Sequence, residues 1–156
     1  MSAFDCGIPA LDEWLRRRAL ANQSSGATRT YIVCRGQAVV GYYALAAGSI
    51  EHSEASGRLK RNMPDPVPMM VLARLAVDRS VQGQGLGADL LRDVVLRVMQ
   101  AAGIVGVRGI LVDAIDETAR AFYERHGFRR STTFPLKVMT TLGEAQRMLA
   151  SIGNQP

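Results

Sequence analysis

Residues 77–95 read VDRSVQGQGLGADLLRDVV and place three glycines at alternate positions, 83, 85 and 87, directly before a helical pattern. A strand that ends in Gly-x-Gly-x-Gly and opens a helix presents unpaired backbone N–H groups at the positive end of the helix dipole. Glycine is required there because a Cβ would keep a ligand away from the main chain, and because the turn can demand a positive φ. The stretch therefore predicts a site for an anion such as a diphosphate.

The residues around this stretch indicate an α/β chain. Residues 67–78, VPMMVLARLAVD, form the near-continuous apolar run that is typical of a strand buried on both faces. From Leu86 onward, apolar residues recur at helical spacing until the AAG at 101–103 ends the pattern. Residues 107–114 then predict a strand, and residues 116–128 predict a helix that Gly127 stops.

The ends of the chain complete the same alternation. Residues 8–22 have the spacing of an amphipathic helix, and residues 30–34 and 38–46 predict a hairpin with a tight, glycine-containing turn. Residues 51–66 have no periodicity and predict a long exposed segment that can hold a helical turn, whereas residues 129–156 predict one or two strands and a short terminal helix. We expect an α/β fold in which helices cover a mixed central sheet.

Composition limits the class of protein. A length of 156 residues predicts a single domain over 1–156, and no apolar run approaches the roughly 18 residues of a membrane span. The N-terminus lacks the layout of a signal peptide, which favours a cytoplasmic protein with no membrane association. Two cysteines and two histidines, far apart, argue against a metal site, and a net charge of +5 suits either a solvated basic face or a polyanionic partner.

Three interpretations of the glycines follow from the residues alone. A Walker A loop needs Gly-Lys-Ser/Thr, which is missing, so an NTPase is disfavoured. The dinucleotide fingerprint G-x-G-x-x-G/A is met by Gly83, Gly85 and Ala88, but residues 78–82 separate it from the strand. Asp113 also lies farther on than the acid expected about 20 residues after the glycines, so a dehydrogenase is weakly supported. A glycine-rich loop with no ligand stays open.

Two motifs carry a resemblance to a known family. Residues 82–87, QGQGLG, resemble the Gln/Arg-x-x-Gly-x-Gly/Ala loop of the GNAT acetyltransferases, which hold the pyrophosphate of acetyl-coenzyme A (acetyl-CoA). Further on, Asp116-x-x-Ala119-x-x-x-Tyr123-Glu124-x-x-Gly127-Phe128 resembles the family's Asn-x-x-Ala-x-x-x-Tyr-Glu-x-x-Gly-Phe element. The resemblance implies a GNAT fold and an N-acetyltransferase that uses acetyl-CoA as co-substrate and needs no metal.

The resemblance also implies roles for individual residues. Backbone groups of the strand end would bind the pantetheine amides, the glycine loop would bind the diphosphate, and the following helix would line the coenzyme. The expected coenzyme-binding residues are Leu75, Ala76, Val77, Gln82, Gly83, Gln84, Gly85, Leu86, Gly87, Ala88, Asp116, Ala119 and Phe122. Asp116 stands where the family usually has Asn, so an amide contact from this position is in doubt. Tyr123 would protonate or hydrogen-bond the coenzyme sulfur; the alternative is that it packs with Phe122 in the core.

A narrower resemblance extends along nearly the whole chain. FDCG at 4–7, LDEWL at 11–15, NQ at 22–23, NMPDP at 62–66 and RLAVD at 74–78 are similar to the acetyltransferase toxins of bacterial toxin–antitoxin modules. In that family the enzyme acetylates the α-amine of aminoacyl-tRNA and blocks translation. The resemblance implies a cognate ribbon-helix-helix antitoxin and a homodimer. The rival interpretations are a GNAT acetyltransferase for a small amine or a protein N-terminus, and a non-catalytic coenzyme-binding module.

Amine chemistry and basic residues are compatible with a tRNA-borne substrate. A lysine amine has a pKa near 10.4, whereas an α-amine titrates at about 7.7 to 8.0 and needs little help from a base. Glu51 and Glu54 are the candidate bases near the acceptor side, although a solvated loop role suits both. Contacts to tRNA phosphates require cations. The residues expected to supply them, each with a solvated surface as its alternative, are Arg29, Arg58, Lys60, Arg61, Arg74 and Arg92.

Overall fold

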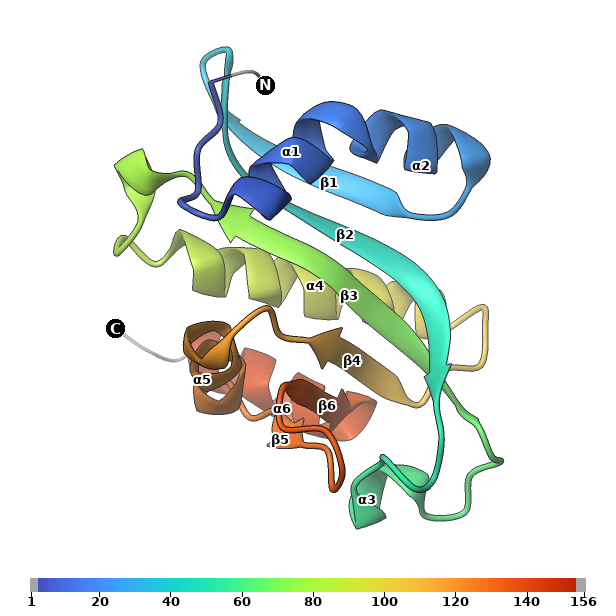
Figure 1. The fold of residues 1–156 in the computed structure, drawn as a ribbon. Coiled ribbons are helices and arrows are strands. Elements are labelled where there is room, and N and C mark those ends of the chain that lie inside the picture. Colours follow the sequence, from blue (N-terminus) through green and yellow to red (C-terminus); the bar gives the residue numbers. More distant parts are fainter. Residues whose placement is uncertain (1–2, 154–156) are drawn as a thin grey trace. The chain divides into compact units, whose positions relative to one another are not determined.

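The computed structural model describes residues 3–153 and contains both helices and strands (Figure 1). The helices are α1 (Pro9–Arg17), α2 (Ala19–Ser25), α3 (Gly57–Lys60), the 3-10 turn η1 (Arg79–Val81), α4 (Leu86–Ala102), α5 (Glu117–Arg125) and α6 (Leu142–Gly153). The strands are β1 (Arg29–Arg35), β2 (Ala38–Ile50), β3 (Val67–Val77), β4 (Gly109–Asp113), β5 (Arg129–Arg130) and β6 (Lys137–Thr141). Within residues 3–153, no helix has the length and apolarity that a bilayer crossing requires.

The strands form a mixed sheet in the order β1-β2-β3-β4-β6-β5, which confirms the expected fold class. β3 and β4 pair in parallel, with Met70 opposite Ile110. The β1–β2, β4–β6 and β5–β6 pairs are antiparallel. The predicted hairpin is present, and its two-residue turn has Gly36 at a φ of +61°, a conformation that glycine adopts without steric cost.

The chain divides into two compact units, each built from two segments of the sequence. Unit 1 comprises residues 1–46 and 72–94, and unit 2 comprises residues 47–71 and 95–156. β2, β3 and α4 run through both units. Residues 1–2 and 154–156 of the expected single domain lie outside the described residues, and the expectation of one domain stays a prediction.

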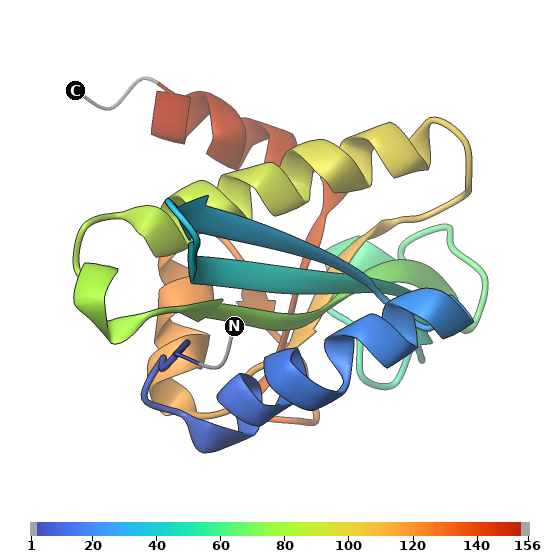
Figure 2. The same ribbon diagram turned by 90° about the horizontal axis from the view of Figure 1, so that it is seen from above.

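In unit 1, helices cover both faces of β2. The side chains of Tyr42 and Ala44 belong to the core cluster that α1 completes. On the opposite face, a Cβ at Gly41 would touch Leu90 of α4, and the Tyr43 hydroxyl donates a hydrogen bond to the carboxylate of Asp93. This alternation is the period-2 geometry of a strand. Figure 2 shows α1 and α2 on one side of β1 and β2 and the beginning of α4 on the other.

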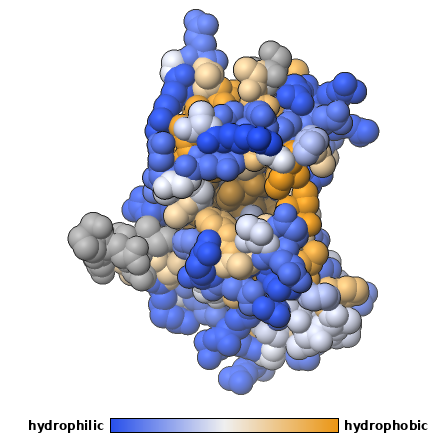
Figure 3. All heavy atoms as spheres, turned by 60° about the vertical axis from the view of Figure 1, so that its left-hand side comes forward, coloured by the Kyte–Doolittle hydropathy of each residue, from blue (hydrophilic) through white to orange (hydrophobic). Residues whose placement is uncertain are grey.

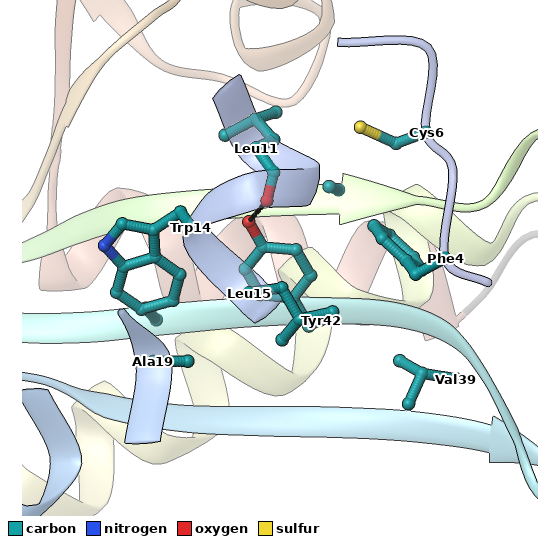
Figure 4. Close-up of a cluster of buried hydrophobic side chains, with 10 residues drawn as sticks. Phe4, Cys6, Leu11, Trp14, Leu15, Ala19, Val39 and Tyr42 are labelled. Atoms are coloured by element: carbon teal, nitrogen blue, oxygen red, sulfur yellow. Dashed lines mark hydrogen bonds between the residues drawn. The ribbon is translucent and has the colours of Figure 1, made fainter. Parts of the chain in front are cut away.

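The core of unit 1 is built around Tyr42 (Figure 4). Its ring stacks on Trp14 with centroids 5.9 Å apart, and its hydroxyl donates a 2.7 Å hydrogen bond to the carbonyl of Leu11. The single helix expected over 8–22 is divided into α1 and α2 at Arg18, whose φ of −116° is wider than the usual helical value although its ψ of −27° stays in the right-handed region. Gly26, at φ +82°, then ends α2.

Unit 2 has its own core, and α3, α5 and α6 all contact β6. The cluster includes Leu59 from α3, Val67 and Met69 from β3, Leu111 from β4 and Met139 from β6. The segment expected to be exposed at 51–66 does hold a helical turn, α3, which Ser56 caps by accepting a hydrogen bond from the Leu59 N–H. It is not exposed throughout, because Ala55 and Leu59 are fully buried in this cluster. β2 continues to Ile50, four residues past the predicted strand end, because Ile50 packs into this cluster.

Candidate active site

The glycine loop lies in unit 1, between the end of β3 and the first turn of α4. Asp78 accepts a hydrogen bond from the Ser80 N–H and so starts η1, after which residues 82–85 lead into Leu86. Gly83 and Gly85 have φ values of +80° and +85°, and a Cβ at either position would meet no atom within 4 Å. These two glycines therefore need their conformational freedom and leave open space beside the main chain.

The N–H groups that follow Gln82 belong to the loop and the first turn of α4. Within residues 3–153, the N–H groups of residues 83–88 donate no hydrogen bond to a backbone carbonyl other than those within helices. The next residue, Asp89, already donates its N–H to the Gly85 carbonyl. The free donors belong to the loop and the first turn of α4, where the helix dipole is positive. This backbone fits a bound diphosphate.

Gln82 differs from the rest of the expected diphosphate residues. Its backbone N–H lies 3.4 Å from the Arg79 carbonyl, and its side-chain Nε2 donates 2.8 Å hydrogen bonds to the carbonyls of Cys6 and Val77. The Gln82 side chain thus joins the loop to protein main chain. Sequence reasoning missed this link because residues 76 positions apart in the chain give no local signal.

The end of β3 presents both core and half-buried side chains. Ala76 is buried in the unit 1 core, whereas the side chains of Leu75 and Val77 are half-buried. The Val77 carbonyl is one of the two acceptors of Gln82, and Asp78 donates its N–H to the Val40 carbonyl. The strand end and the loop are therefore fastened to each other.

In unit 2, α5 carries the second motif. Asp116 is its N-cap and accepts a 2.8 Å hydrogen bond from the Ala119 N–H, so the carboxylate performs the capping that an Asn would perform. Phe122 is half-buried, and His126 Nδ1 lies 2.8 Å from the Phe122 carbonyl at the end of the helix. Gly127, at φ +91°, stops α5 as predicted.

Tyr123 is held by aromatic neighbours. Its side chain is 5 % exposed, and its ring centroid lies 5.2 Å from that of Phe122 and 5.5 Å from that of Phe128. Burial raises the pKa of the phenol well above its ordinary value of 10. The packing with Phe122 that is the alternative for Tyr123 is therefore present, and the role of its hydroxyl as a donor stays a prediction.

Three of the expected tRNA-binding cations lie in unit 1, in different surroundings. Arg29 and Arg92 are exposed, and Arg29 donates to the Gln23 carbonyl at 3.1 Å. Arg74 on β3 places its guanidinium carbon 5.2 Å from the centre of the Trp14 ring and donates to the Ala73 carbonyl. This cation–π contact explains how a charge is accommodated within an apolar strand.

The other three expected cations, Arg58, Lys60 and Arg61, gather at α3 in unit 2. Arg58 and Arg61 are exposed, and Lys60 donates to the His52 carbonyl at 3.3 Å. A further arginine that sequence reasoning missed, Arg108, donates to the carbonyls of Leu59 and Arg58 and so binds the end of α3. Figure 3 shows one face of the molecule, on which hydrophilic side chains cover most of the surface around apolar areas.

Of the two candidate bases, Glu54 has a structural partner. Its carboxylate lies 2.9 Å from the ammonium of Lys137, with both side chains about one-fifth exposed or less, and its carbonyl accepts a 2.6 Å hydrogen bond from Ser131. Glu51 is exposed. The solvated role expected for Glu54 is therefore wrong, because its carboxylate is largely buried and joins the segment before α3 to Lys137 of β6.

Comparison with known proteins gives the family. A model described as an acetyltransferase (GNAT) domain matches residues 26–130. The chain is 50 % identical over 149 residues to a tRNA-acetylating toxin of Mycobacterium tuberculosis, with 96 % of this chain and 90 % of the relative covered.

Comparison with solved structures leads to the same family. AtaT complexed with acetyl-methionyl-tRNAfMet is 31 % identical with a TM-score of 0.85, covering 93 % of this chain and 89 % of that one. A mutant AtaT bound to the C-terminus of the antitoxin AtaR and acetyl-CoA is 30 % identical with a TM-score of 0.80, covering 95 % and 88 %. The expected acetyl-CoA-dependent N-acetyltransferase activity is confirmed, and the chain belongs to the GNAT acetyltransferase family.

Proposed function

We propose that this acetyltransferase transfers the acetyl group of acetyl-CoA to the α-amino group of aminoacyl-tRNA, and that it thereby acts as a toxin that blocks translation. The observation that carries the proposal is the 50 % identity, over 96 % of the chain, to a protein named tRNA-acetylating toxin. The structural similarity to AtaT in complex with acetyl-methionyl-tRNAfMet supports the same substrate class.

The main chain of unit 1 would hold the coenzyme. Residues 83–88 offer free N–H groups to the diphosphate, and the end of β3, Leu75 to Val77, offers backbone groups to the pantetheine amides. Gln82 would act through the loop, since its side-chain amide already has two protein acceptors. Asp116, Ala119 and Phe122 of α5 complete the proposed coenzyme-binding residues. When bound, acetyl-CoA supplies the activated thioester.

Tyr123 is the proposed catalytic acid. Acyl transfer from a thioester releases a thiolate, which a nearby hydroxyl can protonate or hydrogen-bond. The phenol is protonated at neutral pH and can donate a hydrogen bond to the thiolate, while burial, which raises its pKa, disfavours full loss of the proton. The contacts of its ring with Phe122 and Phe128 would fix the direction of that donation.

The substrate amine would need little assistance. An α-amine titrates at about 7.7 to 8.0, and esterification of its carboxylate lowers the pKa further, so a large neutral fraction exists near pH 7.5. The Glu54 carboxylate is paired with the Lys137 ammonium, so no strong base is assigned to the substrate amine. An aminoacyl ester suits such a site better than a lysine side chain does.

Exposed cations would bind the tRNA backbone. Phosphate contacts are independent of sequence and sensitive to salt. Arg58 and Arg61 beside α3, and Arg29 and Arg92 in unit 1, are exposed and meet this requirement best. Lys60 and Arg74 belong to the proposed set with weaker support, because each already contacts protein groups.

A cognate antitoxin is part of the proposal. The similar AtaT binds the C-terminus of the antitoxin AtaR, which supports an antitoxin partner for this chain. A ribbon-helix-helix fold for that partner, a homodimeric toxin and a cytoplasmic location complete the proposed function.

The test uses purified protein, radiolabelled acetyl-CoA and total charged tRNA. We expect label in an RNA-borne fraction that mild alkali releases, and no label on deacylated tRNA. Labelling of a polyamine or of a protein N-terminus, with none on charged tRNA, would replace the proposed substrate with a small-amine or peptide acceptor. Coenzyme binding without transfer to any acceptor would leave only a binding module.

A further inference from the structure

The N-terminal segment of residues 4–7, FDCG, contacts the residues that lead into the glycine loop. Asp5 donates its N–H to Asp78 Oδ2 at 2.9 Å and accepts the Arg79 N–H on its carbonyl at 2.8 Å. The Asp5 carboxylate lies 3.3 Å from Arg79 Nε. Gly7 has a φ of +94°, and a Cβ there would press on the Arg79 guanidinium. The conformation of residues 4–7 therefore matches the surface that Asp78 and Arg79 form.

A buried carboxylate anchors the same segment to α1. Asp12 is 6 % exposed, and its Oδ1 accepts a 2.9 Å hydrogen bond from the Cys6 N–H. The flanking apolar side chains of Phe4 and Cys6 belong to the unit 1 core. Burying a carboxylate costs solvation free energy unless hydrogen bonds in the protein compensate for the lost water. Its partner here is the main chain of the segment that faces the loop.

Gln82 closes the connection. Its Nε2 donates to the carbonyl of Cys6, the residue whose N–H Asp12 holds, and also to the carbonyl of Val77. One amide thus joins the N-terminal segment, the end of β3 and the first residue of the loop. A series of hydrogen bonds runs from Asp12 in α1 through Cys6 to Gln82.

We infer that Asp12, Cys6 and Gln82 are a positioning relay for the diphosphate loop, so that coenzyme affinity depends on residues that do not touch the coenzyme. The inference rests on the proposed function, because it takes the N–H groups of 83–88 as the diphosphate donors. Gly83 and Gly85 give the loop freedom, and a set of backbone donors binds an anion tightly only when it is held in the bound geometry beforehand.

The experiment measures the dissociation constant of coenzyme A by calorimetry. Gln82→Met keeps the side-chain length and removes both donated hydrogen bonds, and we expect binding to weaken about tenfold. The Michaelis constant for acetyl-CoA should rise by a similar factor while kcat at saturation is retained. Asp12→Ala should weaken binding severalfold, whereas Asp12→Asn, which keeps an acceptor oxygen, should restore it.

A double-mutant cycle separates positioning from direct contact. Because Asp12 and Gln82 act through one relay, the double variant Asp12→Ala/Gln82→Met should bind no more weakly than Gln82→Met alone. Additive losses would mean that Gln82 contacts the coenzyme independently, and would overturn the relay.

Tyr42→Phe is the matched control, because it removes a hydrogen bond to Leu11 from the same core and leaves the relay intact. It should lower thermal stability without changing coenzyme affinity. A loss with Tyr42→Phe equal to that with Gln82→Met would assign the effect to general destabilisation and refute the relay. Unchanged affinity in Gln82→Met refutes the relay alone, whereas a wild-type protein that binds no coenzyme refutes the proposed function as well.

Discussion

The glycine loop of unit 1 and the α5 helix of unit 2 meet their proposed tasks by opposite means. The loop offers backbone N–H groups and open space, and the side chain of Gln82 serves only to fasten it. On α5, one side chain matters, and aromatic packing of Phe122 and Phe128 around Tyr123 holds it. Substitutions should therefore separate binding from chemistry.

The largest expected effect is on the α5 side of this comparison. Tyr123→Phe keeps the ring packing and removes the proton donor, so we expect kcat to fall by about 10² to 10⁴ while coenzyme affinity stays unchanged. Transfer to charged tRNA and calorimetry with coenzyme A measure the two quantities, and growth arrest should be lost in cells. Near-wild-type kcat would contradict the assigned role.

The loop side should respond in binding. Gly85→Ala forces a side chain into a φ of +85°, at a cost of about 1–2 kcal/mol, and fills the open space beside the main chain. We expect coenzyme affinity to fall at least tenfold, which corresponds to about 1.4 kcal/mol. Gly106→Ala is the control, since a Cβ there also meets nothing within 4 Å but the φ is not positive. Equal losses of coenzyme affinity in both variants would contradict the proposed role of the loop.

Basic residues of the two units can be compared through salt dependence. Arg58→Ala in unit 2 and Arg92→Ala in unit 1 should each weaken tRNA binding modestly and reduce the slope of log K against log salt by about 1. Arg35, an exposed arginine of β1 outside the proposed set, supplies the control. If only one of the two substitutions changed the slope, the tRNA-binding surface would be restricted to the unit that carries that arginine.

The smallest effect concerns the cap of α5. Asp116→Ala removes the acceptor for the Ala119 N–H and should lower the free energy of unfolding by about 1 kcal/mol. Asp116→Asn should change it by only a few tenths, because both side chains cap equally well. Urea unfolding measures the difference. A strong loss of stability in Asp116→Asn would mean that the charge itself, and not the cap, stabilises the helix.

Local patterns allowed much of this molecule to be predicted. The glycine spacing, the apolar run of β3 and the stop at Gly127 fix conformations within a few residues of themselves, so the loop, α4 and α5 lie where they were expected. The exceptions have tertiary causes. Arg18 divides the first helix without a breaker residue, and β2 extends to Ile50 because that side chain completes a core from distant strands.

The sequence by itself determined the mixed α/β architecture, the backbone character of the loop and the family resemblance, because these depend on residue types at short, regular spacing. Only the tertiary structure decided what Gln82, Asp12, Arg74, Glu54 and Arg108 contact. The partner of Asp12 is the Cys6 N–H, six residues away, and the other four side chains each contact a residue much farther away in the chain. Desolvation and hydrogen bonding select such partners only after the chain has folded, and no local spacing records them.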